Sequence, residues 1–184
     1  MAAELDVGLI LQALRFSADA HRDQRRKDAS HSPYINHPIQ VTELLWTVGR
    51  VQDPATLIAA LLHDTVEDTD AKPTDIRQRF GERVLGLVLE VSDDKSLPKE
   101  TRKRLQVETA ASKSLGARLI KLADKICNLR DLIQSPPADW SLARRQKYLL
   151  WTEEVVAGLR GTNPALERLS DEELANGKRE LGLS

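Results

Sequence analysis

An unbroken apolar segment that follows an aspartate and a proline constrains the fold of this chain more than any other feature. Asp53 and Pro54 form a helix start, because aspartate caps a helix N-terminus and proline suits the first helical turn. Every residue of Leu57–Leu62 is apolar, which predicts a helix over about 55–69 that is buried on nearly all sides. Such a helix needs amphipathic helices packed around it.

The other segments also carry helical spacing, and no window alternates apolar and polar residues for long enough to predict a strand. Ser170 and Glu173 form a capping-box pattern, which predicts that the last helical stretch divides in two. The sequence therefore predicts an all-α, compact multi-helix fold with one domain over 1–184. Besides the buried helix, we expect an opening helix through Val7–Leu14, a helix from His37 to Gly49, and helices over about Thr74–Phe80, Glu82–Val91, Thr101–Ala111, Leu115–Ile133, Leu142–Leu159 and Pro164–Leu181.

Charge and composition exclude several classes of protein. With 27 Lys and Arg against 28 Asp and Glu, the net charge is −1, which argues against a nucleic-acid coat or a polybasic membrane binder. No apolar run approaches the roughly 20 residues that cross a bilayer, and no basic stretch opens the chain as in a secretory leader. The single cysteine, Cys127, excludes a Cys-rich zinc site. We expect a cytoplasmic protein with neither a nucleic acid nor a membrane as partner.

Four residues of metal-ligand type follow the apolar run: His63, Asp64, Glu67 and Asp68. On a continuous helix His63 lies above Glu67 and Asp64 above Asp68, because residues four apart are surface neighbours. Carboxylates packed against a core are costly unless a partner neutralises them, and a metal ion does so directly. The alternative is an exposed acidic helix edge, which suits Glu67 and Asp68 better than the two residues that come straight after the apolar run.

Two further segments offer partners for these residues. His37 opens a helix after a polar loop, and Asp124 interrupts a strongly apolar helix with Asn128 one turn later on the same face. Each has a plain alternative, since a histidine at a helix start is often a cap and Asp124 can pair with Lys121 or Lys125. Their joint occurrence with the earlier group favours a metal site.

The order His37, His63-Asp64, Asp124 resembles the H…HD…D pattern of the HD superfamily of metal-dependent phosphohydrolases. Longer strings are similar to the alarmone hydrolase domain of the RelA/SpoT proteins, and most of all to its stand-alone metazoan branch. The resemblance covers about 21–161. The strings are RK followed by PYINHP within 26–38, AALLHDTVEDT at 59–69 and KLADKICNLRDL at 121–132.

The resemblance implies a (p)ppGpp 3′-pyrophosphohydrolase that produces GDP or GTP and pyrophosphate. It also implies one Mn²⁺ ion bound by His37, His63, Asp64 and Asp124, and this mixed nitrogen and oxygen set suits a moderately hard divalent ion. By the same resemblance Glu67 and Asp68 orient and deprotonate the attacking water. The residues implied to bind the nucleotide are Arg26, Lys27, Lys99, Asn128, Arg144 and Tyr148.

Two other functions stay open. One is an NADPH 2′-phosphatase, because both substrates carry a phosphoryl group on a secondary ribose hydroxyl. The other is a catalytically silent HD domain that binds the alarmone, although the complete ligand set and the Glu67–Asp68 pair argue against it. The bifunctional bacterial enzymes usually carry a threonine where this chain has Asp131, which implies that guanine recognition is looser here.

Overall fold

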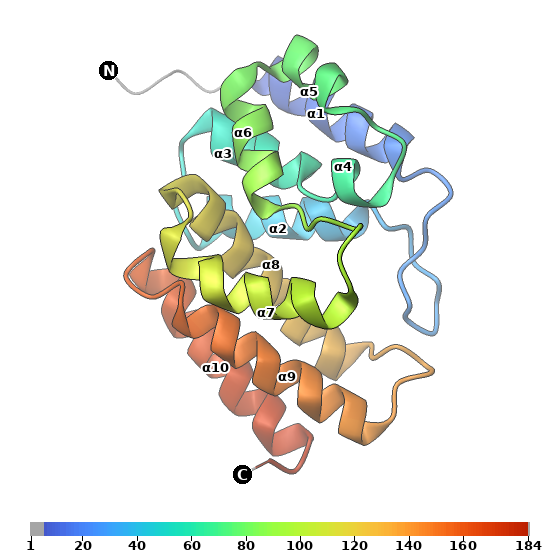
Figure 1. The fold of residues 1–184 in the computed structure, drawn as a ribbon, viewed down its shortest axis with the longest axis vertical. Coiled ribbons are helices and arrows are strands. Elements are labelled where there is room, and N and C mark those ends of the chain that lie inside the picture. The colour runs from blue at the N-terminus through green and yellow to red at the C-terminus, as the bar shows by residue number, and fades with distance from the viewer. Residues whose placement is uncertain (1–5, 184) are drawn as a thin grey trace.

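The computed structural model describes residues 6–183, so residues 1–5 and 184 of the expected domain lie outside the described residues. The described chain consists of helices and connecting loops (Figure 1). Within residues 6–183 the β pairing consists of one isolated antiparallel bridge between Arg25 and Pro33. The all-α prediction is confirmed.

The helices start and end close to the predicted positions. Asp53 caps the buried helix by accepting from the Thr56 main-chain N–H at 3.2 Å, as its sequence predicted. In chain order the helices are α1 (Val7–Ala20), α2 (Asn36–Thr47), α3 (Pro54–Leu62), α4 (Thr65–Asp68), α5 (Pro73–Phe80), α6 (Glu82–Val91), α7 (Lys99–Thr109), the 3-10 turn η1 (Ala110–Ser112), α8 (Leu115–Gln134), α9 (Leu142–Ala157) and α10 (Pro164–Glu180).

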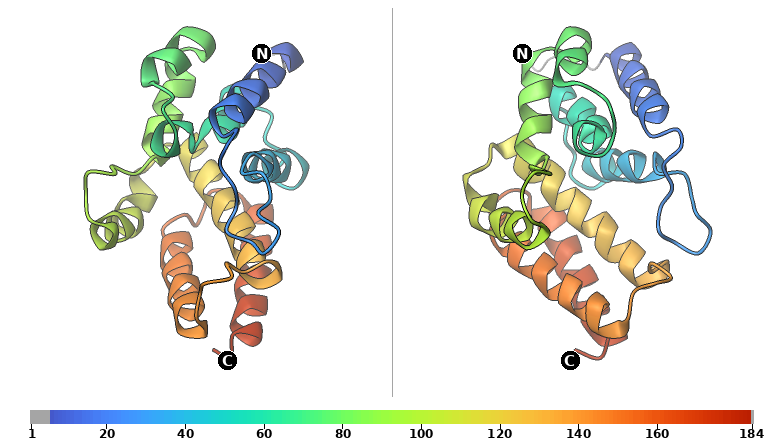
Figure 2. Two further views of the ribbon diagram at one scale, coloured as in Figure 1. Left: turned by 90° about the vertical axis from the view of Figure 1, so that its right-hand side faces the viewer. Right: turned by 45° about the vertical axis from the view of Figure 1, so that its right-hand side comes forward.

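Two helices form the centre of the molecule. In α3 every residue of Thr56–Leu62 is buried, and this helix packs against α1, α2, α6 and α8. The longer α8 runs through the middle of the molecule in all views, with α9 and α10 against its C-terminal half (Figure 2). The prediction of a helix buried on nearly all sides is confirmed, and the ligand-type residues lie at the end of it and in the middle of α8.

The predicted helix over 55–69 is wrong in one respect, because a turn at His63 and Asp64 divides it into α3 and α4, although both residues keep backbone angles of the right-handed helical region. Side chains bind the carbonyl groups at the end of α3: the His63 ring binds Ala60 O at 2.8 Å, and Thr65 Oγ1 donates to Leu62 O at 2.6 Å. Such side-chain hydrogen bonds compete with the main-chain bonds that continue a helix. This turn separates α3 from α4, so the continuous helix expected to place His63 above Glu67 and Asp64 above Asp68 is interrupted between them.

The predicted division of the last helix is also wrong, since α10 is continuous from Pro164 to Glu180. Ser170 is fully buried, and Glu173 accepts a hydrogen bond of 2.6 Å from Arg130 Nε on α8. Both residues therefore serve the packing of α10 rather than a helix cap. The sequence pattern of a capping box is the same in either case.

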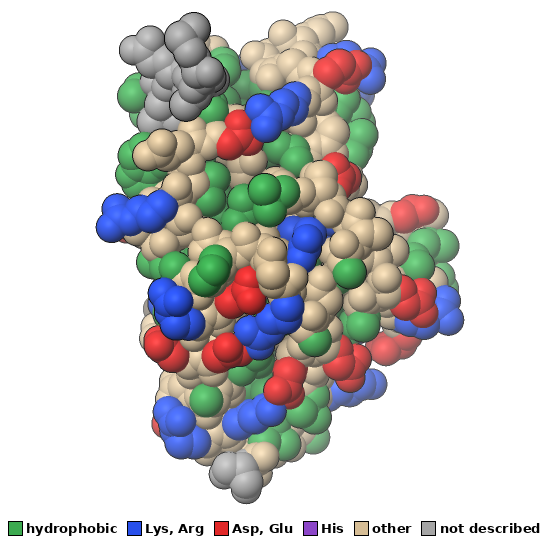
Figure 3. Space-filling model, turned by 90° about the vertical axis from the view of Figure 1, so that its left-hand side faces the viewer, with side chains coloured by type: hydrophobic (Ala, Val, Ile, Leu, Met, Phe, Trp, Pro, Cys, Tyr) green, Lys and Arg blue, Asp and Glu red, His purple; other side chains and the backbone are tan. Residues whose placement is uncertain are grey.

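The surface mixes both signs of charge. On the face drawn in Figure 3, acidic and basic side chains lie among one another, with scattered apolar groups between them. This distribution agrees with the near-zero net charge of the sequence. Among residues 6–183, none of the helices combines the length and the apolar character needed to cross a membrane.

Candidate metal centre and adjoining cavity

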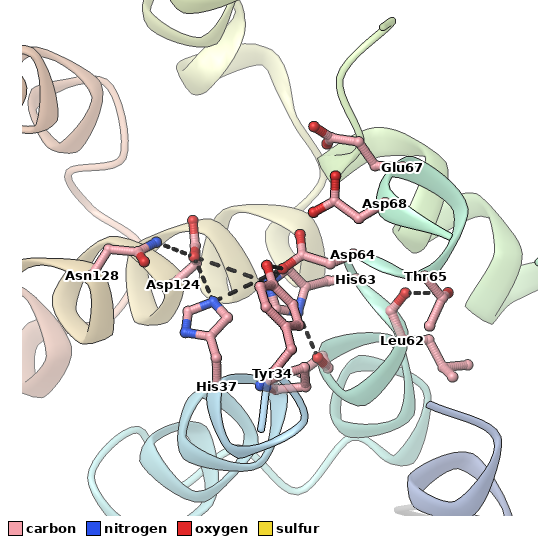
Figure 4. A network of polar contacts seen from close by, with 12 residues as sticks. Tyr34, His37, Leu62, His63, Asp64, Thr65, Glu67, Asp68, Asp124 and Asn128 are labelled. Carbon is pink, nitrogen blue, oxygen red and sulfur yellow. Dashed lines mark hydrogen bonds and ion pairs between the residues drawn. The ribbon is translucent and has the colours of Figure 1, made fainter. Parts of the chain in front are cut away.

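Four predicted ligands converge where α2, α3, α4 and α8 meet (Figure 4). One ligand atom each from His37, His63 and Asp124 lies within 4.8 Å of the others, and all three residues are buried. Asp64 joins them, because its Oδ2 is 3.1 Å from His63 Nε2 and 4.0 Å from His37 Nε2. Asp64 stands at the start of α4 without capping it, so its carboxylate is turned to the centre.

The main chain fixes the His63 ring in the form that a metal needs. A carbonyl oxygen only accepts, so the 2.8 Å contact with Ala60 O places the proton on Nδ1. In this neutral form the Nε2 lone pair faces Asp64 Oδ2 at 3.1 Å, so two acceptors meet, and the buried Nε2 has no hydrogen-bond donor in the described chain. Metal-bound histidines are commonly oriented in this way by a carbonyl group.

Neighbouring side chains orient the two carboxylates. The Tyr34 hydroxyl donates to Asp64 Oδ2 at 2.6 Å, and Asn128 Nδ2 donates to Asp124 Oδ1 at 2.5 Å. Lys125 Nζ lies 3.2 Å from Asp124 Oδ2, with its side chain buried. These partners hold one oxygen of each carboxylate in the direction of the histidine rings, as outer contacts do at metal sites.

The centre attracts positive charge. Burial by itself lowers the pKa of His63, but Asp64 and Asp124 outweigh it and raise that pKa to about 9. Burial likewise opposes ionisation of Asp124, yet Lys125 and His37 hold its pKa well below the usual range. A site that draws a proton onto a buried imidazole accepts a divalent cation in place of that proton. Two imidazoles and two carboxylates, with an unpartnered Nε2 among them, fit such an ion.

The acidic pair lies beside the ligands, on α4. In Figure 4 the carboxylate of Asp68 points toward Asp64, and that of Glu67 lies farther from the ligands. Glu67 Oε2 accepts from the Asp93 main-chain N–H at 2.8 Å, while Asp68 forms an ion pair with Lys95. Burial raises the pKa of Glu67, and the Asp93 N–H opposes this. A carboxylate with a raised pKa is better suited to accept a proton near neutral pH.

A cavity of about 360 Å³ opens beside the centre. This volume lies within the range of roughly 300–1,000 Å³ that is usual for small-molecule sites. Asp68 lines the cavity and so connects it to the acidic pair. Of the predicted nucleotide-binding residues, the cavity brings together Arg26, Lys27, Asn128 and Tyr148.

The other two predicted nucleotide-binding residues do not line this cavity. Arg144 packs 4.4 Å above the Trp140 ring and lies 3.7 Å from Asp139. Lys99 is exposed at the first position of α7. Trp140 lines the cavity, so Arg144 contacts a residue of the cavity wall without lining the cavity itself. Substrate contacts of Lys99 and Arg144 stay predictions.

Three side chains that contact the site were not anticipated: Tyr34, Lys95 and Arg102. Tyr34 donates to Asp64, and Lys95 and Arg102 face the acidic pair from the segment that follows α6. Two partly buried carboxylates are stabilised by nearby cations, so the sequence could have predicted that basic residues lie beside Glu67 and Asp68. The sequence holds 27 Lys and Arg, however, and spacing alone does not say which of them fold back onto α4.

The chain belongs to the HD domain family, since residues 13–153 match that family. It is 54% identical over 162 residues to guanosine-3′,5′-bis(diphosphate) 3′-pyrophosphohydrolase MESH1 of Xenopus tropicalis, which covers 88% of this chain and 90% of that protein. Identity to MESH1 of Homo sapiens is 54% over 158 residues, covering 86% and 88%. A solved structure of a metazoan SpoT ortholog that hydrolyses ppGpp matches with a TM-score of 0.91 and 48% identity, covering 99% of this chain and 100% of the other. The resemblance stated from the sequence is confirmed.

Proposed function

We propose that this chain is a metal-dependent guanosine-3′,5′-bis(diphosphate) 3′-pyrophosphohydrolase. The observation that carries the proposal is the convergence of His37, His63, Asp64 and Asp124 beside the acidic pair and a cation-lined cavity. MESH1 proteins, which carry this activity in their name, are more than half identical to the chain over most of its length.

The proposed reaction is the hydrolysis of the bond between the ribose 3′-oxygen and its diphosphate. The water oxygen forms a new bond to the phosphorus attached to that 3′-oxygen. The bond from phosphorus to the 3′-oxygen breaks, the 3′-oxygen takes up a proton, and pyrophosphate leaves. The nucleotide product is GDP from ppGpp and GTP from pppGpp.

Glu67 accepts the proton of the attacking water in this proposal, and Asp68 orients the water from the same helix. The raised pKa of Glu67 suits this role, because a base is most effective when its pKa approaches the working pH. A divalent ion, which we propose to be one Mn²⁺ held by the four ligands, would acidify the water and neutralise charge on the phosphoryl oxygens. Tyr34 and Asn128 keep the two ligand carboxylates in place.

The cavity supplies the contacts for the nucleotide. Arg26 lies 5.6 Å from the centre of the Tyr34 ring, contacts Asn128 Oδ1 at 3.4 Å and pairs with Asp131, so its planar guanidinium is fixed at the cavity wall, in a form suited to stacking on a base. Lys27 offers a point charge to a phosphate, and Tyr148 offers a partly buried ring. Lys99 and Arg144 are proposed as further cations for the phosphates.

The test is an assay of the purified chain with ppGpp and with NADPH, each with Mn²⁺ and with a chelator. We expect release of pyrophosphate and GDP from ppGpp with Mn²⁺, and none with the chelator. Release of orthophosphate from NADPH without cleavage of ppGpp would support the 2′-phosphatase instead. Binding of ppGpp without any product would support a silent alarmone-binding domain. Replacing Mn²⁺ by Zn²⁺, Fe²⁺ or Mg²⁺ in the same assay tests the identity of the metal.

A further inference from the structure

A second group of polar side chains, outside the four ligands, joins Glu67 to the segment formed by α7 and the loop that precedes it. Arg102 on α7 places Nη1 3.8 Å from Glu67 Oε1 and 3.9 Å from Asp93 Oδ2. The Asp93 main-chain N–H donates to Glu67 Oε2, and Gln106 Nε2 donates to Asp93 Oδ2 at 2.8 Å. The two oxygens of Glu67 thus face different groups, and both groups belong to this segment.

Arg102 differs from its neighbours on α7. Its side chain is 23% exposed, whereas that of Arg104 is 65% exposed and pairs only with Glu108 along the same helix. The helix that carries Arg102 is fastened to α9, because Trp151 Nε1 donates to Lys103 O at 3.0 Å. The backbone that carries Arg102 is therefore held in place, and the side chain is less exposed than in a typical surface ion pair, which is mobile and weak.

The charges around Glu67 come from three segments. Asp64 and Asp68 face it from its own turn, and Asp93 faces it from the loop. The cations are Lys95, 3.9 Å from Glu67 Oε1, and Arg102. Lys95 is half exposed and forms its closer ion pair with Asp68, so Arg102 is the more buried cation that faces Glu67.

We infer that Arg102 is a positioning residue for the proposed reaction, which holds the Glu67 carboxylate in the orientation of a base together with the Asp93 main-chain N–H. This inference rests on the proposed function. Arg102 acts on the reaction through its contacts with Glu67 and Asp93. None of the four proposed metal ligands takes part in these contacts. Loss of the guanidinium leaves Glu67 with the Asp93 main-chain N–H, with the half-exposed Lys95 and with three neighbouring carboxylates.

The test compares Arg102→Gln, Arg102→Lys and the matched control Arg104→Gln with the unaltered chain, using ppGpp and saturating Mn²⁺. For Arg102→Gln we expect kcat to fall roughly 10- to 100-fold, because small displacements of a reacting group cost that much. KM for ppGpp and the affinity for Mn²⁺ stay the same. The acidic limb of the pH–rate profile moves to higher pH, since an opposite charge beside a carboxylate favours its ionised form. Arg102→Lys restores most of kcat, and Arg104→Gln behaves like the unaltered chain.

A rise in KM at unchanged kcat in Arg102→Gln would overturn the inference and make Arg102 a substrate-binding residue. Unchanged kcat, KM and pH profile would overturn it as well. A second readout does not depend on the reaction: the ¹³C shift of the Glu67 carboxyl group, titrated by NMR in the unaltered chain and in Arg102→Gln. Failure of the unaltered chain to cleave ppGpp contradicts the proposed function, whereas an identical Glu67 titration in both chains contradicts the role of Arg102.

Discussion

At the scale of single residues, the site separates the groups proposed to hold a metal from those proposed to move a proton. His63 has its Nδ1 bound to a main-chain carbonyl and its Nε2 without a partner, which is the arrangement of a ligand. Glu67, four residues later, is bound to the Asp93 N–H and lies apart from the ligands. Both residues appear in one string of the sequence, yet the break after α3 gives them different surroundings.

Replacing Glu67 by glutamine tests this separation. Glu67→Gln keeps the size and the polar contacts of the side chain but removes the base, so we expect kcat to fall by about 10²–10⁴, the usual contribution of a general base. Binding of Mn²⁺, measured by calorimetry, stays unchanged because the ligands are intact. Glu82→Gln is the matched control, since Glu82 is exposed and pairs with Arg77. Full activity of Glu67→Gln would contradict the role of base.

The pH dependence of the rate follows from the same residue. Burial raises the pKa of Glu67 above its ordinary value, and a base works only when it is ionised. The rate therefore falls as the pH drops through this raised pKa, so the acidic limb lies above the value of about 4.3 that an exposed glutamate would give. The measurement is a profile of kcat against pH with Mn²⁺ occupancy checked at each point. An acidic limb that is the same in Glu67→Gln as in the unaltered chain would exclude Glu67 as the titrating group.

At the scale of helices, the sequence does not show which residues lie in close contact with a neighbouring helix. Gly158 follows α9, and a Cβ atom there would lie 2.7 Å from Ala110 Cβ in η1. Gly86 lies within α6, where an added Cβ would meet nothing within 4 Å. The two glycines look alike in the sequence, and only the fold distinguishes them.

We predict that replacing these two glycines by alanine changes the free energy of unfolding in opposite directions. Gly158→Ala forces α9 and η1 apart, and we expect a loss of about 1–3 kcal/mol in the free energy of unfolding, as for other overpacked sites. Gly86→Ala replaces the poorer helix former without a clash, so a gain of up to about 1 kcal/mol is expected. Urea unfolding of both variants measures the difference. A destabilised Gly86→Ala, or a Gly158→Ala as stable as the original chain, would contradict the packing described here.

Helix starts were predictable because their causes are local. Asp53 and Pro54 specify the start of α3 through a cap and a fixed φ angle, and both act within one turn. The break at His63 and the continuity of α10 through Ser170 depend on other contacts. His63 and Thr65 bind the carbonyls at the end of α3, and Ser170 is buried by its neighbours. Patterns of apolar spacing carry no information about such contacts.

At the scale of the whole molecule, the candidate metal centre is a long-range feature. His37 and Asp124 are 87 positions apart in the sequence, yet His37 Nε2 lies 3.1 Å from Asp124 Oδ1. Residue types and charge suggested candidates, but plain alternatives remained for each of them. Family resemblance supplied the grouping, because relatives share the fold that brings these segments together. The cations Lys95 and Arg102 lay outside the quoted pattern of ligands, and folding alone places them at the acidic pair.

A metal that joins α2, α3, α4 and α8 should stabilise the molecule as a whole. An ion that binds only the folded chain adds about 2.7 kcal/mol at a concentration of 100 times its Kd. For a chain of this size that corresponds to a rise in Tm of roughly 5–10 °C. We expect this rise on adding Mn²⁺ to the unaltered chain and none for Asp64→Ala, measured by differential scanning calorimetry with chelator-treated protein as reference. Glu67→Gln serves as the control, because it removes a carboxylate near the centre while leaving the four ligands. An equal rise in Asp64→Ala would place the ion elsewhere, and no rise in any of the three chains would contradict a metal centre at this junction.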